Sequence, residues 1–178
     1  MINYIKKLLF VSAGIVAIAG SLFFVNSERV YANVKEGQKF IDWGVTCTED
    51  ANKKQICFLT QSLTSTEKEK TKNLAIFQIG YFGVGKERKL QMMQIIPADV
   101  TIATGTSIIS DKQLLSPGKY VSCNKEYCQA LAVVSEKELA TILSNENNVI
   151  ALINSSGQQV HVPISIKGLA EGLKALKE

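Results

Sequence analysis

The sequence contains a single histidine, and this scarcity argues against most acid–base and nucleophilic active sites. His161 lies in a Val-His-Val-Pro run with no acidic residue or cysteine beside it, and we interpret it as a half-exposed strand residue. A site built only from carboxylates stays open, because Asp42, Asp99 and Asp111 could meet in space, although nothing in their spacing predicts it. We therefore expect a protein that is not an enzyme, with no catalytic residue, cofactor or metal ion.

The chain also has little net charge. It carries 20 basic and 16 acidic residues, a formal net charge of +4. Three of the basic residues and one of the acidic residues lie in the first 32 positions, so the remainder carries 17 and 15, a net charge of +2. Proteins that bind nucleic acids present clustered positive charge, so we expect no nucleic-acid partner. The lysine-rich stretch Thr64–Lys72 interleaves both signs and predicts a solvated loop.

The N-terminal segment has the three parts of a secretory signal peptide. Lys6 and Lys7 precede the uncharged apolar run Leu8–Val25, and a short polar stretch then leads to Val-Tyr-Ala. Small residues stand at the first and third positions before Asn33, and they predict cleavage between Ala32 and Asn33. The alternative is an uncleaved membrane anchor, because about 18 apolar residues approach the length that spans a bilayer. We favour cleavage, which makes residues 1–32 a signal peptide and residues 33–178 a single exported domain.

All four cysteines follow the leader: Cys47, Cys57, Cys123 and Cys128. An even number of cysteines in an exported chain predicts two disulfides. Three pairings are possible, and proximity in sequence favours Cys47–Cys57 with Cys123–Cys128. The alternative is a zinc site, but zinc sites usually pair cysteines two to four residues apart, and nine residues lie between the first two.

Short apolar and alternating runs predict a mainly β, antiparallel β-sandwich-like domain. Each cysteine pair would bridge or close a hairpin, and Trp43 would face the core beside the first disulfide. Leu115–Gly118 predicts a turn. The strand candidates are residues 40–48, 55–63, 74–82, 90–96, 100–109, 120–123, 127–134, 149–153 and 158–165.

Two short helices are expected within this β domain. Ser135 followed by Glu138 has the form of a capping box and predicts a helix over about 135–144. Leu169, Leu173 and Leu176 share one helical face and predict a second helix over about 167–176.

Four sequence features follow one another along nearly all of the chain after the leader. They are Asp42–Cys47 followed by Cys57–Gln61, Ile95–Pro97 leading to Gly105, Cys123–Ala130, and Pro163–Leu169 before a short terminal helix. Together, and in this order, they resemble the invasion-associated locus B proteins of Gram-negative bacteria. Leu169 stands where an aromatic residue would be expected, a small departure.

The resemblance implies an exported protein of the periplasm or the outer-membrane surface, or a secreted one, linked to virulence and to the invasion of host cells. It implies no catalytic residues. We expect a non-catalytic interaction module whose partner is an unknown protein or envelope component, or the host-cell surface; the oligomeric state is not predicted. The alternatives are a periplasmic ligand-binding or structural protein without host contact, and a carboxylate-based glycan hydrolase.

Overall fold

The structure, a computed structural model, describes residues 34–177 except 51–52, 68–69 and 84–86, and it describes no side chains within 65–73. The predicted leader and the cleavage between Ala32 and Asn33 therefore lie outside the described residues. No helix in the described part of the chain is long and apolar enough to cross a membrane.

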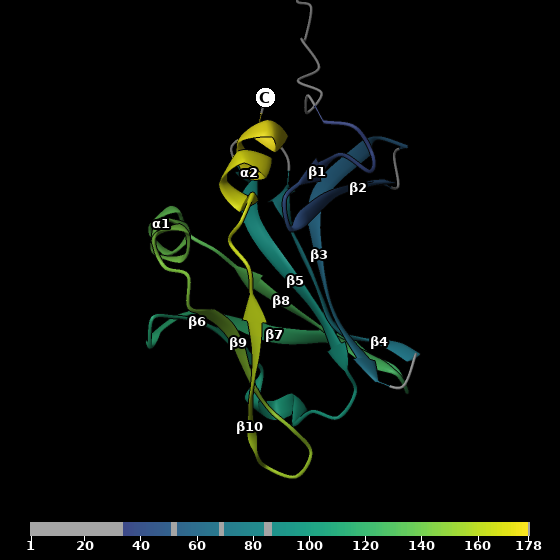
Figure 1. The fold of residues 1–178 in the computed structure, drawn as a ribbon, viewed down its shortest axis with the longest axis vertical. Helices are drawn as coiled ribbons and strands as arrows, with labels where there is room; N and C mark the ends of the chain where they lie inside the picture. Colours follow the sequence, from purple (N-terminus) through teal and green to yellow (C-terminus); the bar gives the residue numbers. More distant parts are fainter. Residues whose placement is uncertain (1–33, 51–52, 68–69, 84–86, 178) are drawn as a thin grey trace, which may run out of the picture.

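Ten strands in the described residues join into a single antiparallel sheet (Figure 1). The order of the strands is β1-β2-β3-β4-β5-β8-β7-β6-β9-β10. The mainly β, antiparallel fold is confirmed, and the two packed sheets that we expected are two parts of one sheet, because β5 pairs with β8. The strands are β1 Lys39–Phe40, β2 Trp43–Glu49, β3 Gln55–Glu67, β4 Lys70–Phe82, β5 Lys89–Pro97, β6 Thr106–Ser110, β7 Gln113–Cys123, β8 Tyr127–Val133, β9 Asn148–Ile153 and β10 Gln159–Ile164.

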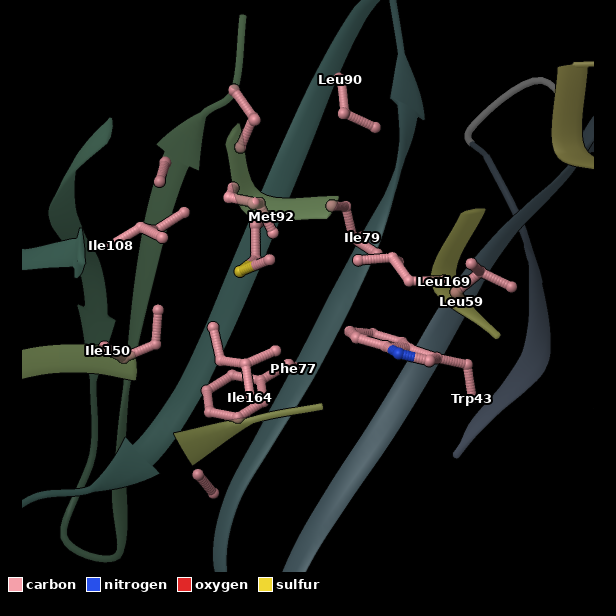
Figure 2. Close-up of a cluster of buried hydrophobic side chains, with 14 of the residues drawn as sticks. Trp43, Leu59, Phe77, Ile79, Leu90, Met92, Ile108, Ile150, Ile164 and Leu169 are labelled. Atoms are coloured by element: carbon pink, nitrogen blue, oxygen red, sulfur yellow. The ribbon is translucent and has the colours of Figure 1, made fainter. Parts of the chain in front are cut away.

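The sheet curls around one apolar core. Along each strand alternate side chains point inward, which is the period of two that a half-buried strand requires. Figure 2 shows Trp43 of β2, Phe77 of β4, Met92 of β5, Ile150 of β9 and Ile164 of β10 converging on the same interior. Each is at most 2% exposed, and burying a side chain of this size stabilises the fold by about 1.5–3 kcal/mol. Strands from both ends of the sheet therefore share one core.

Two segments that we predicted as non-strand are strands instead. Within Thr64–Lys72, β3 continues to Glu67 and β4 begins at Lys70, so the two arms stay paired beyond the core after a register shift at Leu63. Leu115–Gly118 lies inside β7 and not in a turn. Pro117 is accommodated there because it pairs with Ser107, where the β6–β7 register shifts, and proline is tolerated at such irregularities.

Both predicted helices are present. The first helix, α1 (Glu136–Ser144), has Ser135 as its N-cap, and Ser135 and Glu138 form the predicted capping box. The second helix, α2 (Leu169–Lys177), begins two residues later than predicted. It contacts β1 to β4, and its leucines are buried against the same core. The short 3-10 helix η2 (Ile102–Thr104) replaces part of the strand that we expected over residues 100–109.

Both disulfides of the expected pairing are present, Cys47–Cys57 and Cys123–Cys128. Each joins directly facing residues of an antiparallel pair, β2 with β3 and β7 with β8. The Cα atoms lie 4.0 Å and 4.1 Å apart. The N–H of Cys47 donates to the Glu36 carboxylate and so points away from β3. Cys47 and Cys57 therefore form a facing pair without backbone hydrogen bonds between them, the type in which facing residues approach most closely.

Candidate functional site: an edge groove along the last strand

Two of the three carboxylates that could have formed a catalytic site, those of Asp42 and Asp99, lie at opposite ends of one strand. Asp42 accepts a hydrogen bond of 2.6 Å from the Ser165 hydroxyl, just after the end of β10. Asp99 accepts one from the Ser155 hydroxyl, in the turn before β10. A six-residue strand such as β10 spans about 20 Å, whereas paired glycosidase carboxylates lie within about 10 Å. Asp111 lies in the turn between β6 and β7.

A groove with a volume of about 300 Å³ lies along β10, and we call it the edge groove. It is lined by Val160–Pro163 of β10 together with Leu63 of β3 and Leu74 of β4. Ile96 and Leu152, which are nearly fully buried, also line it. The groove is therefore an apolar extension of the core that opens to solvent. The rest of its described lining is Pro97, Asp99, Val100 and Asn154.

The edge of β10 presents unpaired backbone groups beside this groove. The N–H of Asn154 donates to the carbonyl of Gln158, which makes that facing pair a hydrogen-bonded one. Hydrogen-bonded and non-hydrogen-bonded pairs alternate along antiparallel strands, so the backbone groups of Gln159, His161 and Pro163 point away from β9. In the described part of the chain, β10 pairs with β9 alone. The open edge thus offers the N–H and C=O of Gln159 and His161, and the C=O of Pro163.

The far end of the same edge is closed by side chains. Ser165 donates its N–H to Gln61 Oε1 at 3.0 Å, and Gln61 Nε2 donates back to the Ser165 carbonyl at 3.3 Å. The Trp43 indole N–H donates to the same carbonyl at 2.9 Å. The side-chain amide of Gln61 therefore takes the place of a neighbouring strand. This contact holds the end of β10 over the inner face of β3.

Few of the described side chains that line the edge groove are charged. Among them, Asp99 and His161 are the only titratable residues, and the Asp99 carboxylate is already engaged by Ser155. His161 is exposed and lies on the strand edge, where the sequence predicted a half-exposed strand residue. Among the described residues, no group of three His, Cys, Asp or Glu side chains could hold a metal ion. The groove is suited to apolar contact and to backbone hydrogen bonding.

Sequence reasoning did not find the edge groove. Its walls come from strands that are far apart in the chain and meet only because the sheet curls. One signal was available: Gln61 occupies an inward position on β3, in line with the buried Leu59, and a polar residue there needs a partner. The sequence contained no indication that this partner is the backbone of Ser165.

Comparisons with known proteins agree with this architecture. A family model described as Invasion associated locus B (IalB) protein matches residues 43–177. No curated protein matches the chain. Among solved structures, the crystal structure of invasion associated protein B from Bartonella henselae is similar, with a TM-score of 0.66 at 10% sequence identity. The match covers 79% of this chain and 93% of that one. At this identity the likeness concerns the fold.

Proposed function

The chain belongs to the invasion associated locus B family, and we propose that it is an exported envelope or surface protein that binds a protein partner and catalyses no reaction. The leader in the sequence supports export. The two disulfides suit an oxidising compartment outside the cytoplasm. The partner would be an envelope component or a protein of the host-cell surface, and its binding would help the bacterium to enter host cells.

The observation that carries this proposal is the open edge of β10 beside an apolar groove. An exposed strand edge binds an extended peptide through main-chain hydrogen bonds, while adjacent pockets select its side chains. Here Gln159 and His161 offer the hydrogen bonds, and the surface between Leu63 and Val162 offers the pocket. The partner segment that fits is an extended strand with an apolar side chain directed into the groove.

We also propose that the protein has no glycan hydrolase activity. The Asp42 and Asp99 carboxylates are each held by a serine at opposite ends of β10. A second hollow, of about 510 Å³, is lined by Asp42 and Glu146, and these are the two carboxylates that a glycan hydrolase would use there. Purified protein should release no sugar from peptidoglycan or other envelope glycans. Release that is lost in Asp42→Asn would overturn this part of the proposal.

Two cell experiments test the biological role. Deleting the gene should reduce invasion of cultured host cells, and the wild-type gene should restore it. Protease treatment of intact cells should digest a surface protein and spare a periplasmic one. Survival of the protein together with unchanged invasion would favour the alternative, a periplasmic ligand-binding or structural protein without host contact.

A further inference from the structure

Three polar side chains approach the core from the middle of the sheet: Gln94 of β5, Thr106 of β6 and Tyr120 of β7. We call them the inner polar cluster. Gln94 is 0% exposed and Thr106 is 3% exposed. Among the described residues, no hydrogen-bond partner reaches either amide atom of Gln94, the hydroxyl of Thr106 or the hydroxyl of Tyr120. Buried polar atoms are nearly always hydrogen-bonded in folded proteins. We therefore expect the inner polar cluster to have a hydrogen-bond partner besides these three side chains.

The register of the sheet brings Gln94 and Tyr120 to either side of one small residue. Gln94 faces Ala130 across the β5–β8 pair, and Ala130 adjoins Tyr120 across the β8–β7 pair. Neighbouring strands lie about 4.8 Å apart, so the backbones of Gln94 and Tyr120 are separated by about 10 Å. Ala130 is fully buried and ends at its Cβ atom. Ala130 is therefore the short residue between the two longer side chains in this row of the sheet.

A second small residue lies beside Thr106. Thr106 faces Gly118 across the β6–β7 pair. A Cβ atom at Gly118 would lie 2.1 Å from Thr106 Oγ1 and 3.5 Å from Gln94 Nε2. The Thr106 hydroxyl therefore occupies the position that a side chain at Gly118 would take, and the Gln94 amide nitrogen lies near the same position. The pairing register of β7 also shifts on both sides of Gly118. In the pairing with β6 the shift follows Ser107, and in the pairing with β8 it follows Tyr120.

We propose that the inner polar cluster binds at least one structural water molecule, held between the Gln94 amide, the Thr106 hydroxyl and the Tyr120 hydroxyl. Water suits these groups, because it can donate and accept at once, as the amide and the two hydroxyls also do. The cluster includes no charged side chain, so it does not select a metal ion. The Tyr120 hydroxyl is protonated at neutral pH and can donate, and burial raises its pKa further above the ordinary value of 10.0.

The bound water should stay much longer than a surface water, because Gln94 and Thr106 are shielded from solvent. A crystal structure of the protein at a resolution that orders water should show a water oxygen about 2.7–3.2 Å from a Gln94 amide atom and from at least one of the two hydroxyls. In solution, ¹⁷O magnetic relaxation dispersion should detect this slowly exchanging water.

The double variant Gln94→Met/Thr106→Val tests the assignment, because it removes the polar atoms at nearly constant volume. It should lose at least one slowly exchanging water. Thr104→Val, at an exposed threonine in η2, is the control and should lose none. If the double variant does not fold, the wild-type crystal structure decides alone. A direct hydrogen bond from Gln94 to Thr106 or Tyr120, with no water beside them, would overturn the proposal.

Discussion

Gln61 and Ser165 exchange two hydrogen bonds although 104 positions separate them in the chain. Ser165 donates its N–H to the Gln61 side-chain oxygen, and the Gln61 amide donates to the Ser165 carbonyl. A side-chain amide thereby acts as the missing strand at the end of β10. Because Gln61 is only 8% exposed, these bonds lie in a partly buried environment, where an unpaired polar group would be costly.

Replacing Gln61 should destabilise the fold through this contact. Gln61→Leu keeps a similar volume but leaves the backbone N–H of Ser165 without its acceptor. We expect the free energy of unfolding to fall by about 1–3 kcal/mol, the cost of a buried backbone group that loses its partner. Urea denaturation measures it. Gln129→Leu is the matched control, on the half-buried Gln129 of β8, and should change stability by less than about 0.5 kcal/mol. Equal effects of the two substitutions would contradict this role of Gln61.

Gly168 sets the start of α2, and two glycines of similar backbone conformation allow a clean test. Gly168 has a φ of +83°, and a Cβ atom there would lie 1.9 Å from the Phe40 carbonyl oxygen. Gly157 has a φ of +82°, with nothing within 4 Å. Gly157→Ala should cost about 1–2 kcal/mol of stability from the left-handed conformation alone. Gly168→Ala should cost clearly more, because β1 must also move. Similar unfolding energies of the two variants would show that the contact with Phe40 is unimportant.

The two disulfides should stabilise the fold to similar extents. They join residues ten and five positions apart, and closing loops of this size is worth about 2–3 kcal/mol each in the chain-entropy model. Replacing either pair by serines should lower the unfolding free energy by about this amount, with the larger loss for Cys47–Cys57. Mass spectrometry of non-reduced, proteolysed protein should show both pairs. A peptide that joins Cys47 to Cys123 would be incompatible with the hairpins.

The capping box of α1 should make stability depend on acidity. Burial raises the pKa of Glu138, but hydrogen bonds, chiefly from the Ser135 hydroxyl and N–H, lower it, and the pKa in the folded state lies below its ordinary value of 4.5. A lowered pKa in the folded state means that Glu138 stabilises the fold above its unfolded pKa, and that this contribution is lost as the pH falls through the folded value.

Ser135→Ala tests the capping box directly. The variant should lose about 1 kcal/mol at neutral pH, the usual value of an N-cap. Its stability should then fall less than that of the wild type between about pH 6 and pH 3, since one of the bonds to Glu138 is gone. Denaturation curves at several pH values give both quantities. Ser144→Ala, at the other end of α1, should leave the pH dependence unchanged. Parallel pH profiles of the wild type and Ser135→Ala would argue against the assigned bonds.

Local patterns in the sequence predicted the hairpins, the helices and the cysteine pairs, because each depends on residues close together in the chain. The helix over 135–144 was recognised from its capping box, which the structure contains at Ser135 and Glu138. The helix predicted from residue 167 begins at Leu169, since the positive φ of Gly168 is not helical. The leucine pattern predicted which face of this helix is buried, but it did not predict the residue at which the helix begins.

The edge groove and the inner polar cluster could not be predicted in the same way. Both depend on pairings between distant segments, such as β5 with β8 and β6 with β9, and on how the sheet curls. Polar residues at inward positions were the only local sign. Gln61 and Gln94 interrupt apolar faces of β3 and β5, which indicates that a partner is needed without identifying it.

The central claim is that the edge groove binds the partner, and one comparison of variants tests it most directly. Val160, on the groove wall, is 36% exposed, and Val133, on β8 away from the groove, is 50% exposed. Both can therefore carry a glutamate without burying it. Each variant would be returned to the deletion strain at wild-type levels, and host-cell invasion would be measured. We predict that Val160→Glu fails to restore invasion and that Val133→Glu restores it fully. Full restoration by Val160→Glu would contradict the account.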